Sequence, residues 1–588
     1  SGHAQEPSAY STTETVVERT GSSECDGRPS HDTVVENKPI LPLDSPGTFE
    51  DRDQRDAAPA RTFVPPLNEH RCLILCFDGT GDQFDADNSN IVQLVSALKK
   101  DDRTKQMVYY QSGIGTYTSS KSVTPLGTKL SLVRTLDAMI AWNLDAHVMA
   151  GYEFLMQNYT ASDRICIFGF SRGAYIARSL AGMIHKVGLL PTDNHQQVPF
   201  AYKMYTRTDK TGWAQSNAFK KAFSNDVHID FLGVWDTVDS VGLIPRRLPF
   251  TTSNTIVRTF RHAVSLDERR AKFKANLWNF PNDREKKLGT HAAPPGTPMR
   301  PPPPKRRFTY PRRAFTAHSK TSTTSDDDET KQAKFENQYA QYHLRTRETD
   351  VLEVWFAGCH CDVGGGSVPN DTRHSLARIP LRWMIRECFK ADTGIIFDAQ
   401  RLRELGLDHT TLHPVVLERS PLRDIKSARI APPPPRRSWL RRLLSHDRPP
   451  EPAPVVELVD PEPKAGLTTS MEDEEDLKDA LSPIYDQLQL KPFWWILEII
   501  PMSFRSQKPD DRWVTTFGPN LGHPRKIPHQ KEREDDDELA AHDYKGHHPP
   551  VNVKVHRSVK IRQAARDSKG RPQYVNRARF ECEPDYVE

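Results

Sequence analysis

The sequence predicts an α/β fold in which a mostly parallel central sheet is covered by helices on both faces. Short, continuous apolar runs of strand length recur at 71–77, 164–169, 229–235 and 354–358. Stretches with apolar residues at helical spacing separate several of these runs. Strands that are apolar on both sides and alternate with helices are typical of a parallel sheet that is buried on both faces.

The composition indicates that much of the chain lies outside a folded core. Of the 588 residues, 36% are hydrophobic and 27% are charged, and 47 are prolines. Such a balance is typical of a globular domain combined with disordered segments. The formal net charge of +4 is too small for this length to indicate a nucleic-acid-binding protein. We therefore expect no nucleic-acid partner, and the sequence does not predict an oligomeric state.

Low-complexity segments divide the chain. Residues 1–66 are rich in Ser, Thr, Glu, Pro and Asp and are expected to form a disordered tail. Residues 67–428 are expected to form the α/β domain, interrupted at 281–346 by a disordered insertion that is rich in Pro and in charge. Residues 429–480 contain Pro runs and an acidic run, so we expect a disordered linker. Residues 481–588 are expected to pack on the domain.

The first elements follow from local signals. The apolar run at 71–77 is a strand that Asp78-Gly79-Thr80-Gly81 ends. Asn88-Ser89 can cap a helix through Leu98. A strand is expected at 107–111, and a long helix is expected from about 130 to 159.

Gly169-Phe170-Ser171-Arg172-Gly173 is a candidate nucleophile elbow. The motif alone is common, but an apolar strand precedes it at 164–169 and a helix with a small-residue face follows it at 173–187. An elbow needs this strand, a tight turn and a helix, so that the serine hydroxyl stands above the sheet edge. We predict an α/β-hydrolase with Ser171 as the nucleophile. The alternative is a serine in an ordinary strand-to-helix turn.

A serine hydroxyl needs a histidine base and an orienting carboxylate. In this fold they follow the nucleophile in the order acid, then histidine, at the ends of later strands. Asp236 directly follows the strand at 229–235, and His360 follows the strand at 354–358. We predict that Asp236 is the acid and that His360 is the base.

Other residues compete for these roles. The alternative role for Asp236 is to cap the turn that follows the strand. Asp239 and Asp362 are the next candidates for the acid. His262 and His556 are rival histidines, and each is expected to make a structural hydrogen bond instead.

An oxyanion hole requires backbone N–H groups that point at the developing charge. One is expected from Arg172, directly after the nucleophile. The other is expected from the turn after the first strand, where Gly79 lets the backbone turn inward and Thr80 or Gly81 donates. Asp78 in the same turn is a secondary candidate for the site.

The cysteines predict neither disulfides nor a metal. The eight cysteines show no disulfide framework, which favours a reducing compartment. Cys359-His360-Cys361 has no second Cys/His pair at ligand spacing nearby, and direct neighbours point to opposite faces of an extended segment. We predict no metal site, and triad hydrolysis needs no organic cofactor.

Two short segments concern membranes. No apolar run reaches the roughly 18 to 20 residues of a membrane span, and no secretory signal is visible, so a cytoplasmic protein is expected. The segment 436–444 has an apolar face among arginines, typical of either an interfacial helix or a solvated linker. The apolar segment 492–500 is expected to pack against the domain, with an acyl pocket or lipid contact as the alternative.

Five colinear segments resemble the uncharacterised α/β-hydrolase domain of the type VI secretion phospholipase effector Tle1 and of many fungal proteins. The segments are Leu75–Thr80, Gly169–Tyr175, Phe231–Val238, Arg261–Arg270 and Trp355–Gly366, and residues 555–559 are similar to the family's C-terminal end. The resemblance implies an α/β-hydrolase fold. It also implies the triad Ser171, Asp236 and His360. The chain departs from the family pattern in its Pro-rich insertions and at Cys359 and Cys361.

For the bacterial effectors the resemblance implies phospholipase activity on membrane lipids. We therefore expect a serine hydrolase that forms an acyl-enzyme on a small ester or lipid substrate and meets membranes peripherally. The alternative is a catalytically silent scaffold whose disordered arms recruit partners. A phosphatase of the haloacid dehalogenase type is excluded, because Cys76 occupies the position of its nucleophilic Asp.

Overall fold

The computed structural model describes part of the chain. The described residues are 62–79, 82, 84–113, 144–238, 247–279, 332, 336, 349–422, 428–432, 470–507, 513–527, 553–580 and 583–588. They all belong to one compact unit, Arg61–Glu588. The first part of the helix predicted at 130–159, nearly all of the 281–346 insertion and the 436–444 segment lie outside the described residues.

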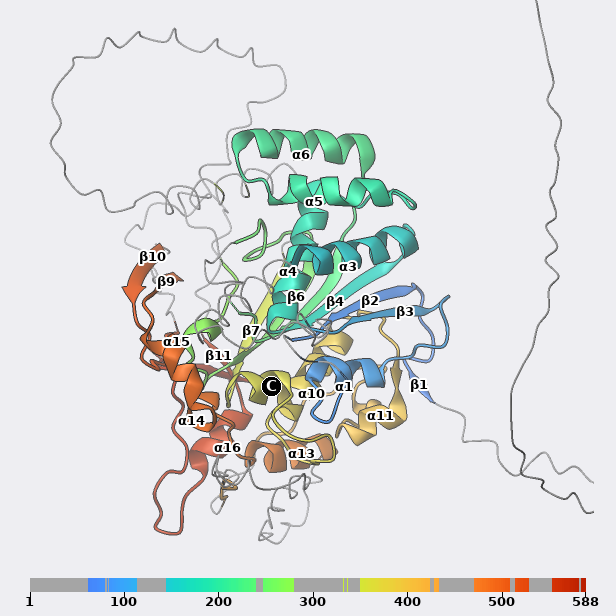
Figure 1. Ribbon diagram of the computed structural model, residues 1–588. Helices are drawn as coiled ribbons and strands as arrows, with labels where there is room; N and C mark the ends of the chain where they lie inside the picture. The colour runs from blue at the N-terminus through green and yellow to red at the C-terminus, as the bar shows by residue number, and fades with distance from the viewer. Residues whose placement is uncertain are drawn as a thin grey trace, which may run out of the picture. The chain divides into compact units, whose positions relative to one another are not determined.

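An eight-stranded sheet forms the centre of the unit (Figure 1). Its strand order is β12-β11-β7-β6-β5-β4-β2-β3, and neighbouring strands pair in parallel. The strands are β2 (Cys72–Phe77), β3 (Gln106–Gln111), β4 (Arg164–Phe170), β5 (Ile229–Trp235), β6 (Val257–Ser265), β7 (Asp350–Phe356), β11 (Lys554–His556) and β12 (Asp585–Val587). The predicted fold class is confirmed.

Helices lie on both sides of this sheet (Figure 1). On one side are α3 (Leu144–Asn158), α4 (Arg172–Val187), α5 (Val198–Thr206) and α6 (Lys210–Phe223). On the other are α1 (Asn90–Ala97), α10 (Arg378–Lys390), α11 (Ala399–Glu404), α13 (Met471–Ala480) and α16 (Ser558–Ala564).

Smaller elements complete the unit. The one-turn helices are η1 (His195–Gln197), η2 (Ala271–Phe273), η3 (His409–Thr411) and η4 (Pro492–Trp494), and the short α-helices are α9 (His360–Gly364), α14 (Gln487–Leu490) and α15 (Trp495–Ile499). Two antiparallel pairs stand apart from the main sheet, β1 (Phe63–Val64) with β8 (Phe397–Asp398), and β9 (Met502–Gln507) with β10 (Trp513–Gly518).

Strand β2 shows why the apolar runs are continuous. Leu73 and Phe77 belong to the core that contains residues of α3 and α4. Ile74 and Cys76 belong to the second core, on the side of α1 and α10. Successive strand residues point to opposite faces, so a strand covered on both faces is apolar at every position.

The helix predicted after Asn88-Ser89 is confirmed as α1, and the Ser89 side chain caps it by accepting a hydrogen bond from the Val92 N–H.

In contrast, the sequence analysis does not predict β6 as a separate strand. Its buried Arg261 pairs with Glu387, and its buried His262 bonds Glu353, so charged residues interrupt its apolar pattern.

Part of the segment that is predicted to be a disordered tail is ordered. Phe63 and Val64 form β1 and pair with Asp398 and Phe397 of β8. A two-residue strand is too short for hydrophobic periodicity to reveal it, so the sequence placed the boundary at residue 66.

The acidic end of the linker predicted at 429–480 is not disordered, because residues 471–480 form α13. Arg382 of α10 places one nitrogen 2.5 Å from both Asp476 and Asp479. Arg386 pairs with Glu472 at 3.0 Å. The acidic run is therefore a buried ion-pairing face, and its partners lie too far away in the sequence to be recognised.

The C-terminal segment adds two strands to the sheet. Lys554 and Val555 of β11 align with Val354 and Trp355 of β7, and β12 pairs with β11. Among the described residues, no helix has both the length and the hydropathy that crossing a bilayer requires. The six described cysteines are free thiols.

Candidate active site

Ser171 stands on a strained turn between β4 and α4. Its φ is 58° and its ψ is −119°, a region that residues with a side chain rarely adopt. Glycines on both sides allow the close approach. A Cβ on Gly169 would lie 2.6 Å from the Ala174 Cα, and one on Gly173 would lie 2.3 Å from the Phe77 carbonyl oxygen. The sequence therefore places the serine at a tight strand-to-helix junction.

Ser171, His360 and Asp236 form one hydrogen-bonded chain. The Ser171 Oγ lies 2.8 Å from the His360 Nε2, and the His360 Nδ1 lies 2.6 Å from the Asp236 Oδ2. Ser171 follows β4, Asp236 follows β5, and His360 follows β7, so all three lie where parallel strands end at the same sheet edge. All three side chains are buried. The structure thus brings together the three residues that the sequence analysis selected.

The protonation states suit a histidine that accepts a proton. Burial alone would raise the pKa of Asp236, but the charge of Arg525 and the hydrogen bond with His360 outweigh it and hold that pKa well below its usual range. Burial lowers the pKa of His360 below its ordinary value, although the hydrogen bond and charge of Asp236 act in the opposite direction. At neutral pH the pair is therefore a carboxylate and a neutral imidazole.

Two residues that the sequence analysis missed hold the Asp236 carboxylate. The Ser265 N–H donates to the Oδ1 at 2.9 Å, and the Ser265 hydroxyl donates to the Oδ2 at 3.2 Å. Arg525 donates to both oxygens, at 2.6 and 3.0 Å. Asp236 therefore has a fixed orientation toward His360.

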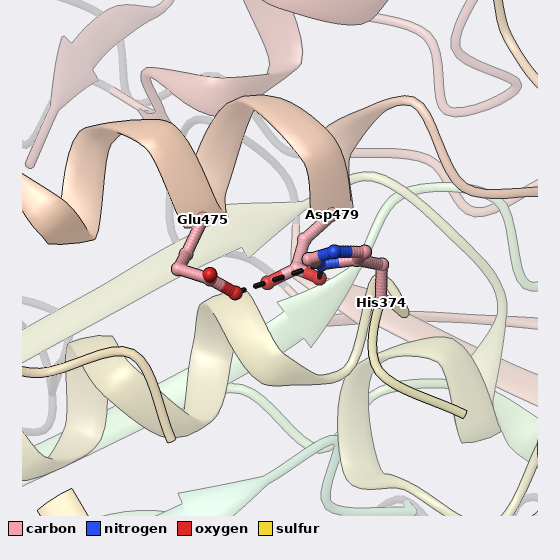
Figure 2. A group of neighbouring side chains, drawn as sticks. All are labelled: His374, Glu475 and Asp479. Carbon is pink, nitrogen blue, oxygen red and sulfur yellow. Dashed lines mark ion pairs between the residues drawn. The ribbon is translucent and has the colours of Figure 1, made fainter. Parts of the chain in front are cut away.

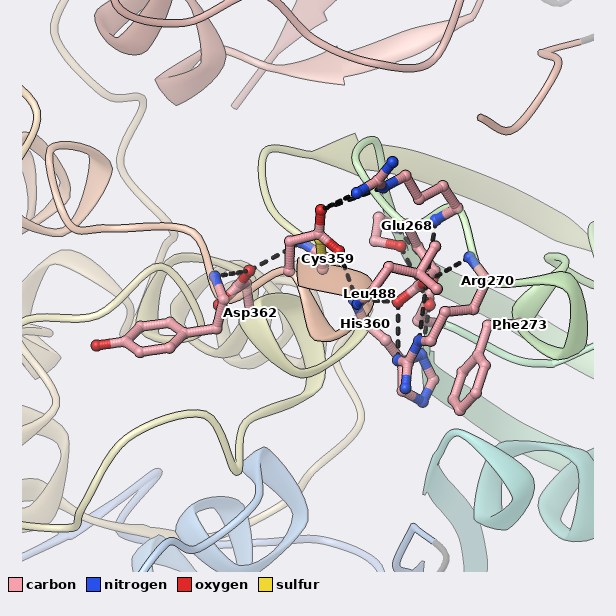
Figure 3. A network of polar contacts seen from close by, with 12 residues as sticks. Glu268, Arg270, Phe273, Cys359, His360, Asp362 and Leu488 are labelled. Atoms are coloured by element: carbon pink, nitrogen blue, oxygen red, sulfur yellow. Dashed lines mark hydrogen bonds and ion pairs between the residues drawn. The ribbon is translucent and has the colours of Figure 1, made fainter. Parts of the chain in front are cut away.

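A second buried ion pair holds the backbone of His360 (Figure 3). The Glu268 carboxylate accepts from the His360 N–H at 3.2 Å and pairs with Arg270 at 2.8 Å. Although burial opposes ionisation, the charge of Arg270 lowers the pKa of Glu268 to about 2. The Arg270 guanidinium lies over the Phe273 ring, whose edge meets the His360 ring at 4.7 Å between centroids. This pair thus fixes both the backbone and one ring face of His360.

Asp267 fastens the loop between β7 and α9. Its carboxylate accepts from the Gly358 N–H at 2.7 Å, from the Tyr574 hydroxyl at 2.9 Å and from the Arg577 N–H at 3.0 Å. Ser265 is the last residue of β6, and Asp267, Glu268 and Arg270 follow it directly in a polar run. That run was the available signal for these missed residues.

The predicted oxyanion donors have different surroundings. Arg172 is the first residue of α4, and the N–H groups of a first helical turn favour negative charge. The Gly79 N–H instead donates to the Asp78 Oδ1 at 2.8 Å. Thr80 and Gly81 lie outside the described residues. Asp78 also accepts from Ser89 and Tyr110, so its carboxylate organises this turn.

The alternative residues have structural partners. His262 is buried between Glu353, 2.7 Å from its Nδ1, and the Thr237 N–H, which donates to its Nε2 at 3.1 Å. The Nδ1 of His556 lies 2.8 Å from the Ser558 Oγ. Asp362 accepts from the backbone N–H groups of Cys359 and Tyr485, and burial raises its pKa to about 7. Asp239 lies outside the described residues.

His374, Glu475 and Asp479 form a group with the spacing of metal ligands (Figure 2). The His374 Nδ1 lies 3.5 Å from Glu475 and 3.3 Å from Asp479. Arg373 also pairs with Glu475 at 2.9 Å, and Arg382 pairs with Asp479 at 2.5 Å. Arginines therefore already supply the positive charge that a metal would bring, and the group joins α13 to the rest of the unit.

The apolar segment 492–500 packs against the domain only in part. Trp494 meets the edge of Phe273 at 5.5 Å between centroids. Phe493, Ile496 and Ile499 are 58%, 48% and 63% exposed. The segment therefore packs against the domain through Trp494, while Phe493, Ile496 and Ile499 stay exposed.

Comparison with known proteins identifies relatives. The family described as the T6SS phospholipase effector Tle1-like catalytic domain matches residues 71–387. The uncharacterized protein YEL023C of Saccharomyces cerevisiae is 30% identical in an alignment of 543 residues that covers 78% of this chain and 76% of the yeast protein.

Two solved structures are also similar. A crystal structure of an uncharacterized protein from Pseudomonas aeruginosa has 17% identity and a TM-score of 0.27, covering 58% of this chain and 50% of its own. The structure of the Tle1 effector bound to the VgrG spike from the type 6 secretion system has 16% identity and a TM-score of 0.23, covering 50% and 51%. This chain thus spans about half the length of each solved chain. The family match covers Ser171, Asp236 and His360, and the chain belongs to the Tle1-like catalytic domain family.

Proposed function

We propose that this protein is a serine hydrolase that cleaves carboxylic esters of lipids, with phospholipids as the class that the family suggests. The observation that carries the proposal is the hydrogen-bonded chain from Ser171 through His360 to Asp236. A strained serine next to a neutral histidine is the arrangement that nucleophilic ester hydrolysis requires.

In this mechanism the Ser171 Oγ attacks the ester carbonyl carbon while the His360 Nε2 accepts the hydroxyl proton. The alcohol leaves with that proton, and the acyl group stays on Ser171. His360 then takes a proton from the water that attacks the acyl-enzyme, and it returns this proton to the Ser171 Oγ as the carboxylic acid is released. Asp236 stabilises the imidazolium in both steps, and the Arg172 N–H is the proposed oxyanion donor. No metal or organic cofactor takes part.

Labelling with a fluorophosphonate tests the nucleophile. Wild-type protein should label covalently, and Ser171→Ala should not. Ser179→Ala is the matched control, because Ser179 is also buried on α4 but donates to the Tyr175 carbonyl. Absence of labelling in folded wild-type protein would overturn the proposal and favour the catalytically silent scaffold.

The substrate class needs a separate test. Mixed micelles of phospholipids with different headgroups should release fatty acid in the presence of wild-type protein but not of Ser171→Ala. Hydrolysis of a short soluble ester without any lipid hydrolysis would retain the serine hydrolase and contradict the lipid substrate.

A further inference from the structure

Arg525 forms a bidentate ion pair with Asp236. It lies after β10, outside the segment matched by the family, and its side chain is 3% exposed. Its Nη1 lies 2.6 Å from the Oδ1 of Asp236, and its Nη2 lies 3.0 Å from the Oδ2. The Nη1 also donates to the Ser265 hydroxyl at 2.8 Å, and the Nε donates to the Phe273 carbonyl at 3.2 Å. These hydrogen bonds therefore fix the position of the Arg525 guanidinium.

This contact adds charge to a carboxylate that is already oriented. The N–H and hydroxyl of Ser265 would hold Asp236 without help from a cation. The acid of a triad acts by its negative charge, which favours the imidazolium form of the histidine. A guanidinium bound to both oxygens offsets part of that charge.

We propose that Arg525 is a positioning residue for the hydrolysis, which locks Asp236 against His360 and limits how strongly Asp236 favours the imidazolium. The inference rests on the proposed function. Arg525 acts through Asp236 and does not contact His360 or Ser171 in the hydrogen bonds described. Its consequence is a histidine that remains an unprotonated base at lower pH.

The charged groups around Asp236 and His360 determine whether the loss of Arg525 raises or lowers the pKa of His360. The titratable and charged groups that act on Asp236 or His360 are Arg525, His262, Glu268 and Arg270, and Lys274 acts on Arg525. Arg270 opposes protonation of His360, whereas Glu268 and Asp236 favour it. Removal of the Arg525 charge leaves Asp236 uncompensated, so the pKa of His360 must rise. The acidic limb of kcat/KM, which reports protonation of the base, then moves to higher pH.

The experiment compares Arg525→Gln, Arg525→Lys and a control in the full chain. Glutamine keeps one hydrogen bond to Asp236 without the positive charge, and lysine keeps the positive charge without the bidentate contact to both carboxylate oxygens. Arg382→Gln is matched, because Arg382 is equally buried and pairs with carboxylates of α13. The readout is the pH profile of kcat and KM on a soluble ester.

Arg525→Gln should raise the acidic limb by about one pH unit, the shift expected when an opposing charge is lost beside a buried pair. Arg525→Lys should keep the limb near its wild-type position but lower kcat with KM unchanged. Arg382→Gln should leave the limb unmoved. A folded Arg525→Gln protein with the wild-type limb would overturn the proposal, and if that variant does not fold, an Arg525→Lys protein with wild-type kcat would overturn it.

A second readout separates this inference from the proposed function. In protein labelled with ¹³C-histidine, the His360 signal is identified by its loss in His360→Gln, and its titration is followed by NMR. A higher midpoint in Arg525→Gln supports the proposal even if the wild type shows no turnover that depends on Ser171. An unchanged midpoint contradicts it, whatever the activity.

Discussion

The backbone of Ser171 stores conformational strain. Its positive φ places it in a region that costs a residue with a Cβ on the order of 1 to 3 kcal/mol. Close packing of Gly169 and Gly173 against their neighbours prevents the turn from relaxing. A serine that presents its hydroxyl at this junction therefore lowers the stability of the folded state.

Two inactive variants separate this strain from the loss of the hydroxyl. Ser171→Ala keeps the strain, whereas Ser171→Gly relieves it at a smaller cost in the entropy of the unfolded chain. We expect Ser171→Gly to be more stable than Ser171→Ala by about 1 kcal/mol, measured by equilibrium unfolding in urea. Equal stability of the two variants would show that the turn is not strained.

The sequence pointed to Ser171, Asp236 and His360 because each lies shortly after an apolar strand, and Ser171 also lies in the Gly169–Gly173 motif. Arg525 could not be found in this way. Its partner Asp236 lies 289 residues earlier in the chain, and the polar residues around Arg525 carry no periodicity. A contact of this kind is a property of the tertiary structure, which local patterns do not encode.

Among the helices and strands, α13 is another case in which local sequence patterns do not encode a tertiary contact. Its run of acidic residues has the composition of a solvated segment, yet Glu472, Asp476 and Asp479 are buried. Strands β2, β4 and β5 were recognisable because their partners are apolar and need no specific match. An ion-paired helix depends on arginines from α10 and from beyond η3, so its order cannot be predicted from its own residues.

The buried pairs of α13 should matter more than exposed ones. Asp476→Asn leaves Arg382 and Arg419 buried without their full countercharge, and we expect a loss of about 3 to 5 kcal/mol in unfolding free energy. Glu404→Gln is the control, because Glu404 pairs with Arg401 at an exposed site, where about 0 to 1 kcal/mol is expected. Urea unfolding of both variants measures the difference, and similar losses would contradict the structural role of α13.

At the scale of the whole molecule, exposed apolar residues lie in a segment next to the candidate active site and are a candidate contact surface for the lipid substrate proposed above. Phe493, Ile496 and Ile499 form what we name the apolar face of η4 and α15. Trp494 in the same segment contacts Phe273, which in turn contacts His360. Only a chain of ring contacts therefore separates this face from the candidate catalytic histidine.

In the triple variant, Phe493, Ile496 and Ile499 are all changed to Ser. Its binding to phospholipid vesicles should be at least tenfold weaker than that of the wild type. The reason is that about 1.5 to 3 kcal/mol is lost for each large apolar side chain that no longer enters the lipid. Turnover of a soluble ester should stay near wild type. Vesicle flotation measures the binding. Val415→Ser is the control, because Val415 is 69% exposed in another segment. Unchanged flotation of the triple variant would exclude this face as the lipid contact.

The large separation of Arg525 from Asp236 along the chain also bears on how the protein is made. A chain grows at roughly 5 to 20 residues per second, so the 289 residues between Asp236 and Arg525 take on the order of 15 to 60 s to synthesise. During that time Asp236 lacks its arginine, and strands β11 and β12 are absent from the edge of the sheet. The nascent chain therefore carries the candidate nucleophile before the candidate site is complete, and the proposed ester cleavage should begin only after Arg525 has been synthesised.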